Sequence, residues 1–340
     1  MLKLSVGYQD SEKYGFSQIV RTYRDAIEEV YFAFVGEPSG RSALGGYDGY
    51  FDYTLQARLV SELKAIRALG IRLDLLFNAN CYGADAMSEV LRGRVLSIIE
   101  YLESEGLLPE TVTTASPAIA TVVRECFPSI ELRASVNMRI GSVKGMQYMS
   151  HLFDSFCVAK EVNRDPSRLR AMRAFADAEG KRLVMLANSG CMRDCSGQIF
   201  HDNMVAHESE IAKQKNIKLL PYACWNYLKD PKNYPAVLQN TWILPEDIDR
   251  YEGLIDTVKL ATRTHALPGM VIDAYARRRS LGNLLDLFEP GFSPVFAPLV
   301  IDRSRLPADF YERTVGCDKA CERCDYCRAA LEGALVNADE

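Results

Sequence analysis

The sequence predicts an α/β protein, namely a (β/α)8 TIM-like barrel that continues into a C-terminal cysteine-rich tail. Eight short runs rich in β-branched and aliphatic residues alternate with amphipathic stretches, which is typical of a parallel sheet with crossover helices. Several runs are apolar on both faces, as strands of a covered parallel sheet must be. The 340 residues also suit one barrel of about 250 residues with an appendage. Closure is inferred from the count of eight strands, and an open sheet is the alternative.

The order of the elements follows from where each pattern begins and ends. We expect strands at residues 2–8, 30–36, 71–78, 111–115, 130–136, 156–161, 182–188 and 257–262. Apolar residues three and four apart predict helices at 16–29, 53–69, 87–105 and 166–178. Between Cys191 and Asp256 the alternation breaks for about 65 residues, which predicts a functional loop or a segment with structure of its own.

Periodicity fades towards the C-terminus, so we expect a barrel over residues 1–285 and a tail over residues 286–340. Residues 289–307 contain four prolines and are predicted to be extended chain that wraps the barrel. A short helix is expected at 328–336.

Composition narrows the class of protein. The net charge of −5 gives no global basic field that would attract nucleic acid. No apolar run is long enough to cross a bilayer, and the N-terminus lacks the apolar region of a signal peptide, so we expect a cytoplasmic protein. Ten cysteines in a reducing compartment indicate metal ligands or redox groups rather than disulfides.

The tail carries four cysteines within eleven residues, in the spacing C-x3-C-x2-C-x2-C. Charged residues fill the gaps, which argues against an apolar core and favours metal binding. Four thiolates could hold zinc, and thiolates at such spacings also bind iron–sulfur clusters, so both metals stay open. The first three also match the C-x3-C-x2-C spacing of radical S-adenosylmethionine enzymes, although most of those carry it after the first barrel strand. The expected ligands are Cys317, Cys321, Cys324 and Cys327.

A second group of cysteines follows the seventh expected strand. Cys191 comes directly after the strand, Cys195 follows four residues later, and Cys224 lies further along. Their polar flanks near a barrel mouth favour ligation, and Arg193 would favour thiolate over thiol.

The other cysteines occur singly. Cys126 in a helix pattern and Cys157 in a strand pattern are expected to be buried small hydrophobes. Cys81 follows the third strand at the expected active face and is a candidate ligand or reactive thiol.

Polar residues follow several expected strands, and in a barrel these ends lie on the face that carries the active site. A single such residue more often makes a turn or a helix cap, but four polar ends that lead towards a cysteine pair favour a pocket. A histidine there could ligate metal or act as an acid or base, and an arginine could bind a carboxylate or phosphate. For Arg164 the alternative is a salt bridge with Glu161 that only closes the barrel. The candidate pocket residues are Asn78, Asn80, Glu161, Arg164, Asn188, His201 and Arg263.

The order of several short motifs resembles that of the collagenase-like peptidase family U32, in its iron–sulfur barrel branch. The matching stretches are Val30–Phe34, Leu76–Asn80, Ser135–Asn137, Glu161–Asp165, Leu186–Cys191, Asp256–Arg263 and Ala274–Tyr275, spread over residues 2–285. The resemblance implies a barrel fold and, for several members, an iron–sulfur cluster on four cysteines that serves oxygen-independent hydroxylation of RNA bases or quinone precursors. The cysteine spacing differs here and the tail is an addition, so the substrate is not carried over.

These observations support three functions. The first is an iron–sulfur enzyme with one or two [4Fe–4S] clusters, in which Glu161, Arg164, His201 and Arg263 are catalytic and Asn78, Asn80 and Asn188 bind the cofactor. The second is a zinc-containing hydrolase or peptidase with structural zinc in the tail. The third is a non-catalytic partner subunit that carries a cluster. The expected partners are a small-molecule or nucleobase substrate and a protein partner or electron donor, without a membrane. We expect the tail to fold back over the barrel mouth and bring the two cysteine groups together.

Overall fold

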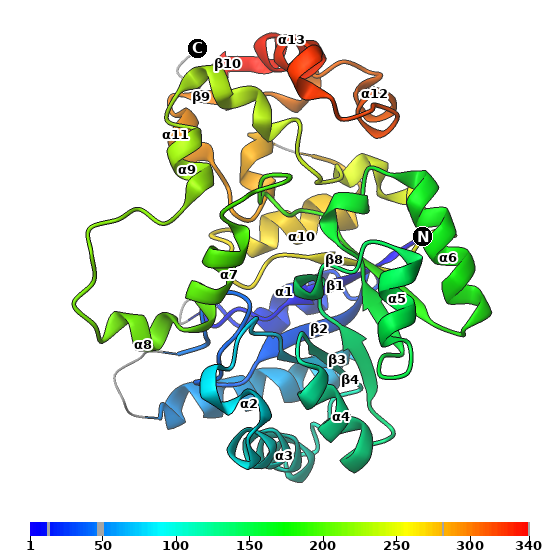
Figure 1. The fold of residues 1–340 in the computed structure, drawn as a ribbon, viewed down its shortest axis with the longest axis vertical. Coiled ribbons are helices and arrows are strands. Elements are labelled where there is room, and N and C mark those ends of the chain that lie inside the picture. The colour runs from blue at the N-terminus through cyan, green and yellow to red at the C-terminus, as the bar shows by residue number, and fades with distance from the viewer. Residues whose placement is uncertain (12–13, 46–50, 281, 339–340) are drawn as a thin grey trace.

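The computed structural model describes residues 1–11, 14–45, 51–280 and 282–338 and shows a closed barrel of eight parallel strands in chain order (Figure 1). β1 pairs with both β2 and β8, and the Lys3–Thr257 to Val6–Leu260 register closes the ring. Both the barrel and its closure are therefore confirmed. The strands are β1 Lys3–Gly7, β2 Ile27–Ala33, β3 Arg72–Phe77, β4 Thr111–Thr114, β5 Glu131–Ala134, β6 Ser155–Cys157, β7 Arg182–Leu186 and β8 Thr257–Leu260.

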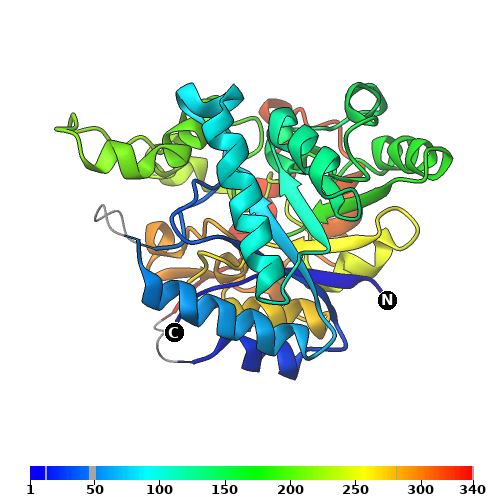
Figure 2. The same cartoon turned by 90° about the horizontal axis from the view of Figure 1, so that it is seen from below.

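Helices cover the outside of the barrel (Figure 2). Several begin at a side-chain cap, for example Asp52 on the Leu55 N–H and Ser88 on the Leu91 N–H, which satisfies a free donor of the first turn. Apolar residues at helical spacing in α2, such as Leu59 and Leu63, are buried against the strands. The covering helices are α1 Phe16–Thr22, α2 Tyr53–Arg67, α3 Glu89–Ser104, α4 Pro117–Cys126, α5 Val143–Met149, α6 Pro166–Ala178 and α10 Pro268–Ala276.

The helix expected at 16–29 ends earlier than predicted, because β2 begins at Ile27. Three short 3-10 helices occupy loops at the carboxyl ends of strands, namely η1 Gly83–Met87, η2 Val136–Met138 and η3 Lys160–Val162. Cys126 ends α4 and is exposed, so its expected burial is wrong, whereas Cys157 in β6 is buried as expected.

The inside of the barrel is ionic. The guanidinium of Arg133 in β5 pairs with Glu29 in β2 and lies 3.3 Å from Asp74 in β3, and all three side chains are fully buried. Lys259 in β8 approaches Asp74 at 3.5 Å and lies over the ring of Tyr31. Branched aliphatic residues usually fill such barrels, so this network is a distinguishing feature of the chain.

The long segment between β7 and β8 has structure of its own, as the sequence predicts. It forms α7 Gln198–Ala206, α8 Glu208–Ala212, α9 Ala223–Tyr227, η4 Pro231–Val237 and η5 Pro245–Tyr251. No helix among the described residues is long and apolar enough to cross a membrane.

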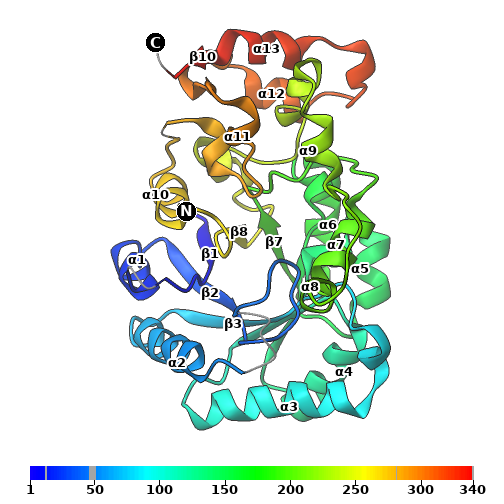
Figure 3. The same cartoon turned by 90° about the vertical axis from the view of Figure 1, so that its left-hand side faces the viewer.

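The C-terminal residues pack with part of that segment into a second core. Trp242 stacks on Phe288 and Phe310 with ring centroids 4.6 Å and 5.9 Å away. Short elements interrupt the chain expected to be extended at 289–307, and α12 and α13 lie at the end of the molecule away from α3 (Figure 3). The elements are η6 Leu284–Leu287, α11 Ser293–Phe296, β9 Leu299–Ile301, η7 Arg303–Arg305, α12 Phe310–Val315, η8 Cys321–Arg323, α13 Tyr326–Ala334 and β10 Leu335–Asn337, with β9 and β10 antiparallel.

Candidate functional site

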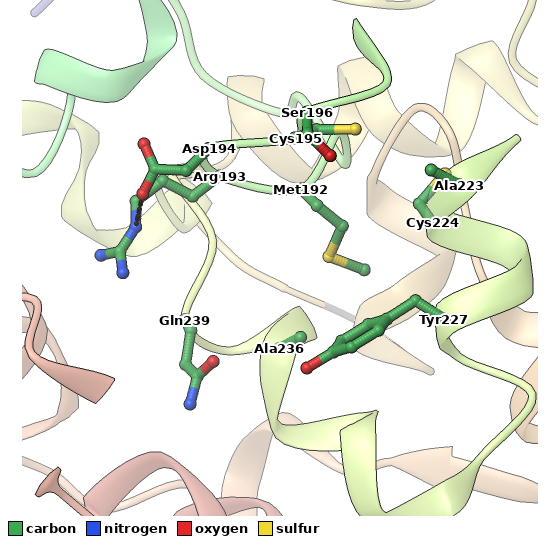
Figure 4. Close-up of a pocket in the computed structure, with 10 residues that line it drawn as sticks. All are labelled: Met192, Arg193, Asp194, Cys195, Ser196, Ala223, Cys224, Tyr227, Ala236 and Gln239. Atoms are coloured by element: carbon green, nitrogen blue, oxygen red, sulfur yellow. Dashed lines mark hydrogen bonds and ion pairs between the residues drawn. The ribbon is translucent and has the colours of Figure 1, made fainter. Parts of the chain in front are cut away.

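Three cysteines from two segments line adjoining pockets at the mouth of the barrel. Cys191 and Cys195 lie in the loop after β7, and Cys224 lies on α9. One pocket, here the Tyr227 pocket, has a volume of about 350 Å³ and is drawn in Figure 4, where Met192 and Tyr227 point into it from different elements. It is lined by Met192, Arg193, Asp194, Cys195, Ser196, Ala223, Cys224, Tyr227, Ala236 and Gln239.

The other pocket, here the His201 pocket, has a volume of about 240 Å³ and takes in all three thiols. Its other walls come from several elements: Arg41, Ser42, Met192, Gln198, His201, Val205, Glu208, Tyr222, Trp225, Thr264, Glu289 and Pro290. Cys195 and Cys224 therefore face both cavities, while Cys191 belongs to the His201 pocket.

Gly190 fixes the approach to Cys191. Its N–H donates to the carbonyl of Glu289 at 2.8 Å, and a Cβ at this position would lie 2.0 Å from the carbonyl oxygen of Pro290. Only glycine fits such a close backbone contact, so the loop that carries Cys191 is clamped to the chain at 289–290.

Positive charge lies beside these thiols. Arg41 lies in the loop between β2 and α2, and its Nη2 is 3.6 Å from Cys191 Sγ. Burial raises the pKa of Cys224 to about 11, and the neighbouring Cys191 raises it further in the same direction. A bound metal ion would reverse this, since a coordinating thiol gives up its proton.

The tail lies against the same loop. Arg193 Nη2 donates to Cys321 Sγ and to the carbonyl of Lys319, both at 3.3 Å. Burial raises the pKa of Cys327 to about 11, and the other three tail thiols lie near enough to influence it. The tail therefore contacts the loop after β7 through Arg193, while the expected meeting of the two cysteine groups over the barrel mouth stays a prediction. Whether a tail cysteine completes a barrel cluster stays a prediction.

The donor set suits a cluster of iron and sulfide, because thiolates are the ligands that such clusters use. Within the described ranges, however, no group of three or more Cys, His, Asp or Glu side chains has an arrangement that would hold a metal ion. Metal binding by either cysteine group therefore stays a prediction.

His201 lies where the sequence predicts, in a pocket with the thiols. Its ring packs edge-on against Tyr222 with centroids 5.0 Å apart. Burial lowers the pKa of His201, and the nearby Arg41 lowers it further, so the imidazole is neutral at pH 7. A neutral imidazole can accept a proton or ligate metal.

Arg164 does not face the mouth, contrary to expectation. Its guanidinium donates to the carbonyls of Trp242 at 3.0 Å and Leu238 at 2.9 Å, and it lies 4.3 Å from the Trp242 ring. The expected alternative, a bridge to Glu161, is not what the structure records either, since Glu161 pairs with Lys160 at 2.8 Å. The planar guanidinium of Arg164 can donate to two carbonyls at once, and both carbonyls belong to residues of the second core. Arg164 therefore joins the barrel to the second core.

Two of the asparagines hold backbone together. Asn188 exchanges hydrogen bonds with the N–H and carbonyl of Ala261 and donates to the carbonyl of Leu287, which ties β7 to the chain after β8. Asn78 accepts from the Ser39 hydroxyl at 3.0 Å and the Gly40 N–H at 3.1 Å, directly before Arg41. A supporting role accounts for both contact sets, and a cofactor role stays a prediction.

The remaining candidates lie at carboxyl ends of strands, outside the two thiol pockets. Asn80 is half-buried after β3, and Arg263 is half-buried after β8, where its carbonyl accepts from Gln9 at 3.3 Å. Glu161 lies in η3. Neither these three nor Arg164 is among the residues that line the pockets as described.

Sequence reasoning missed Arg41 and Glu289. Burial raises the pKa of Glu289, which neighbours Arg41 in the His201 pocket. Arg41 could have been found, because it lies in a loop at the carboxyl end of a barrel strand, where active-site residues gather. Glu289 had no such signal, since it follows all eight strands.

The fold and the site together define a (β/α)8 barrel protein with a thiol-lined mouth. No family model matches the chain. The chain is 23% identical to a protein of Methanocaldococcus jannaschii named uncharacterized protease MJ1657. The alignment of 317 residues covers 91% of this chain and 90% of that protein. The solved structure of the U32 peptidase Mk0906 matches with a TM-score of 0.55 and 15% identity, over 76% of this chain and 92% of that one. The structural match confirms the fold, and the two matches together support the resemblance to the U32 peptidases that the motif order predicts.

Proposed function

We propose that this protein is an enzyme of the U32 type that binds a [4Fe–4S] cluster through Cys191, Cys195 and Cys224 and acts on a small molecule or nucleobase. The observation that carries the proposal is the convergence of three thiols from two segments on the His201 pocket. A [4Fe–4S] cluster held by these three thiolates would leave one iron without a cysteine ligand, and that iron would supply a Lewis acid for the substrate.

The surrounding residues have separate tasks in this proposal. Arg41, 3.6 Å from the Cys191 sulfur, offsets the negative charge of thiolates and orients an anionic group of the substrate. His201 is neutral at pH 7 because burial lowers its pKa, so it accepts a proton from substrate. Met192, Tyr222 and Trp225 supply apolar wall that limits water in the pocket.

Anaerobic metal and sulfide analysis tests the proposal. The purified protein should be brown, absorb near ~400 nm and contain about four irons and four sulfides for the barrel cluster. Cys191→Ser, Cys195→Ser and Cys224→Ser should each lose that iron. Cys126→Ser is the matched control, because Cys126 is exposed on α4 outside both pockets, and it should retain the full iron content.

A zinc-containing hydrolase or peptidase is the second candidate. It is favoured by the name of the methanogen relative, a protease, and by the four thiols of the tail. Protein that contains zinc without iron and cleaves peptides would replace the first proposal with this one. Iron–sulfur protein that shows no turnover with a reductant and candidate substrates would instead indicate a cluster-carrying partner subunit.

A further inference from the structure

A second group of reactive side chains adjoins the thiol pockets. Cys81 follows β3, His207 joins α7 to α8, and Glu210 lies within α8. All three line a cavity of about 170 Å³ that is separate from both thiol pockets, although Val205 and Glu208 border it as well as the His201 pocket. The cluster proposed above does not use these three side chains.

The three side chains are arranged in the order Cys81, His207, Glu210. His207 Nδ1 lies 3.0 Å from Glu210 Oε2, and His207 and Cys81 line the same cavity closely enough for each to shift the pKa of the other. Since Nδ1 is engaged by the carboxylate, Nε2 is the ring nitrogen left for the sulfur. The order thiol, imidazole, carboxylate is the arrangement by which cysteine nucleophiles are activated.

The backbone after Cys81 supports the same sulfur. The N–H of Gly83 donates to Cys81 Sγ at 3.3 Å. Gly83 has φ +57°, and a Cβ there would lie 3.4 Å from His207 Cε1, so the turn and the imidazole are in close contact. The interactions with His207 and Gly83 lower the pKa of Cys81, and the interaction with Cys81 raises the pKa of His207, so both shifts favour transfer of the thiol proton to the imidazole.

We propose that Cys81 is the nucleophile of a second active site that takes a small acyl donor, an ester or an amide. His207 removes the proton from the thiol while Cys81 Sγ forms a bond to the carbonyl carbon. The bond from that carbon to the leaving oxygen or nitrogen breaks, and His207 protonates the leaving group. Water then attacks the thioester with His207 as base, which releases the acid and returns the thiol.

The volume of the pocket limits the size of the substrate, and the exposure of Glu210 limits how much this carboxylate contributes to catalysis. At about 170 Å³ it is smaller than the ~300 Å³ at which pockets for drug-sized ligands begin, so it suits a short acyl chain. Glu210 is 73% exposed, so its pairing with His207 orients the ring without a large electrostatic gain. His207 is therefore the more important partner.

Acetylation by 4-nitrophenyl acetate tests the proposal on the full-length protein. Peptide mass mapping should find one acetyl group on Cys81, accompanied by a burst of nitrophenolate. His207→Gln should slow the burst by at least ~100-fold and Glu210→Gln by no more than ~10-fold. Cys126→Ser should leave the burst unchanged, since Cys126 lies on α4 without these partners.

Several outcomes would overturn the proposal. They are acetylation of Cys126 as fast as that of Cys81, a burst unaffected by His207→Gln, or iodoacetamide labelling of Cys81 without acetylation. Cys81→Ala, checked for folding by circular dichroism, must abolish the burst and keep the iron content. Loss of iron in that variant would make Cys81 a metal ligand instead. Iron lost in Cys191→Ser with the burst intact separates this site from the cluster proposal.

Discussion

At the scale of single residues, Arg164 shows how a buried charge can serve the fold. Its side chain lies between the barrel and the second core, where it bonds two carbonyls and lies over the Trp242 ring. Burial lowers the pKa of Arg164 to about 10, so the group remains charged at pH 7. The two carbonyls and the aromatic face provide the negative potential that a buried guanidinium requires.

We expect Arg164→Ala to destabilise the protein by about 2–4 kcal/mol, because it leaves a cavity and two buried carbonyls without donors. Arg164→Lys should recover little of this, since lysine lacks the planar fork. Urea denaturation followed by tryptophan fluorescence measures the effect, and Arg170→Ala on the exposed face of α6 is the control. A variant of Arg164 with unchanged stability and weakened substrate binding would return this residue to the active site.

At the scale of elements, the tail combines a helix that packs with a turn that carries thiols. Ala330, Leu331 and Ala334 of α13 are buried in the second core, and β10 pairs with β9. The cysteines precede or begin this helix and reach the Arg193 loop through Cys321. Truncation at residue 316 would therefore remove buried packing together with the four thiols.

Serine at all four tail positions, 317, 321, 324 and 327, separates the two effects. We expect this variant to keep the iron of the barrel cluster and to lose only the metal bound by the tail, because α13 and its buried face remain. Anaerobic counts of iron and zinc per chain check it against the Cys191→Ser variant. An unchanged metal content would mean that the tail binds none, and loss of all iron would mean that one cluster needs ligands from both groups.

The elements also show what could be predicted from the sequence. Each barrel strand falls within or beside a run rich in β-branched and aliphatic residues, so the sequence locates all eight strands, with shifts of a few residues. The predicted helix at 16–29 is longer than α1, because Ala26–Val30 fits a helical pattern as well as a strand pattern. Cys191, Cys195 and Cys224, which the sequence places after β7, line one pocket, and their role as metal ligands stays a prediction. The partners Arg41 and Glu289 lie about 250 residues apart in sequence, and only closure of the barrel brings them together.

At the scale of the whole molecule, the candidate site lies where two cores meet. Barrel strands and their helices form the first core, while Met192 belongs to the second, and Cys195 and Cys224 pack against it. A substitution that alters the packing of the second core is therefore expected to displace the loop that carries Cys191 and Cys195. Arg164, the Gly190 clamp and Asn188 are among the contacts that join the two cores.

The ionic interior of the barrel makes the stability of the whole molecule depend on pH. Burial would raise the pKa of Glu29, but pairing with Arg133 outweighs it and lowers the value to about 2. Burial raises the pKa of Asp74 to about 6 against the opposing charges of Lys259 and Arg133. Oδ1 of Asp74 has no hydrogen-bond partner among the described residues, so it is the atom where a proton fits.

The two carboxyls act in opposite directions. An unfolded Asp titrates near ~3.9, so between about pH 4 and pH 6 the folded protein binds a proton at Asp74 that the unfolded chain has released. Asp74 therefore contributes stability below about pH 4 that is lost as the pH rises through 6. Glu29 contributes stability above about pH 4.3 that is lost only as the pH falls through 2.

We expect Asp74→Asn to remove the part of this dependence that falls between pH 4.5 and pH 7, because an amide stays neutral throughout. Relative to the variant, the wild-type protein should lose stability as the pH rises from 4.5, and the loss should level off above about pH 6. Urea denaturation at half-unit steps, with metal content matched, measures the difference. Glu100→Gln on the exposed face of α3 is the control and should follow the wild type. A constant difference between wild type and Asp74→Asn would show that Asp74 is ionised throughout, and that Lys259 and Arg133 together outweigh its burial.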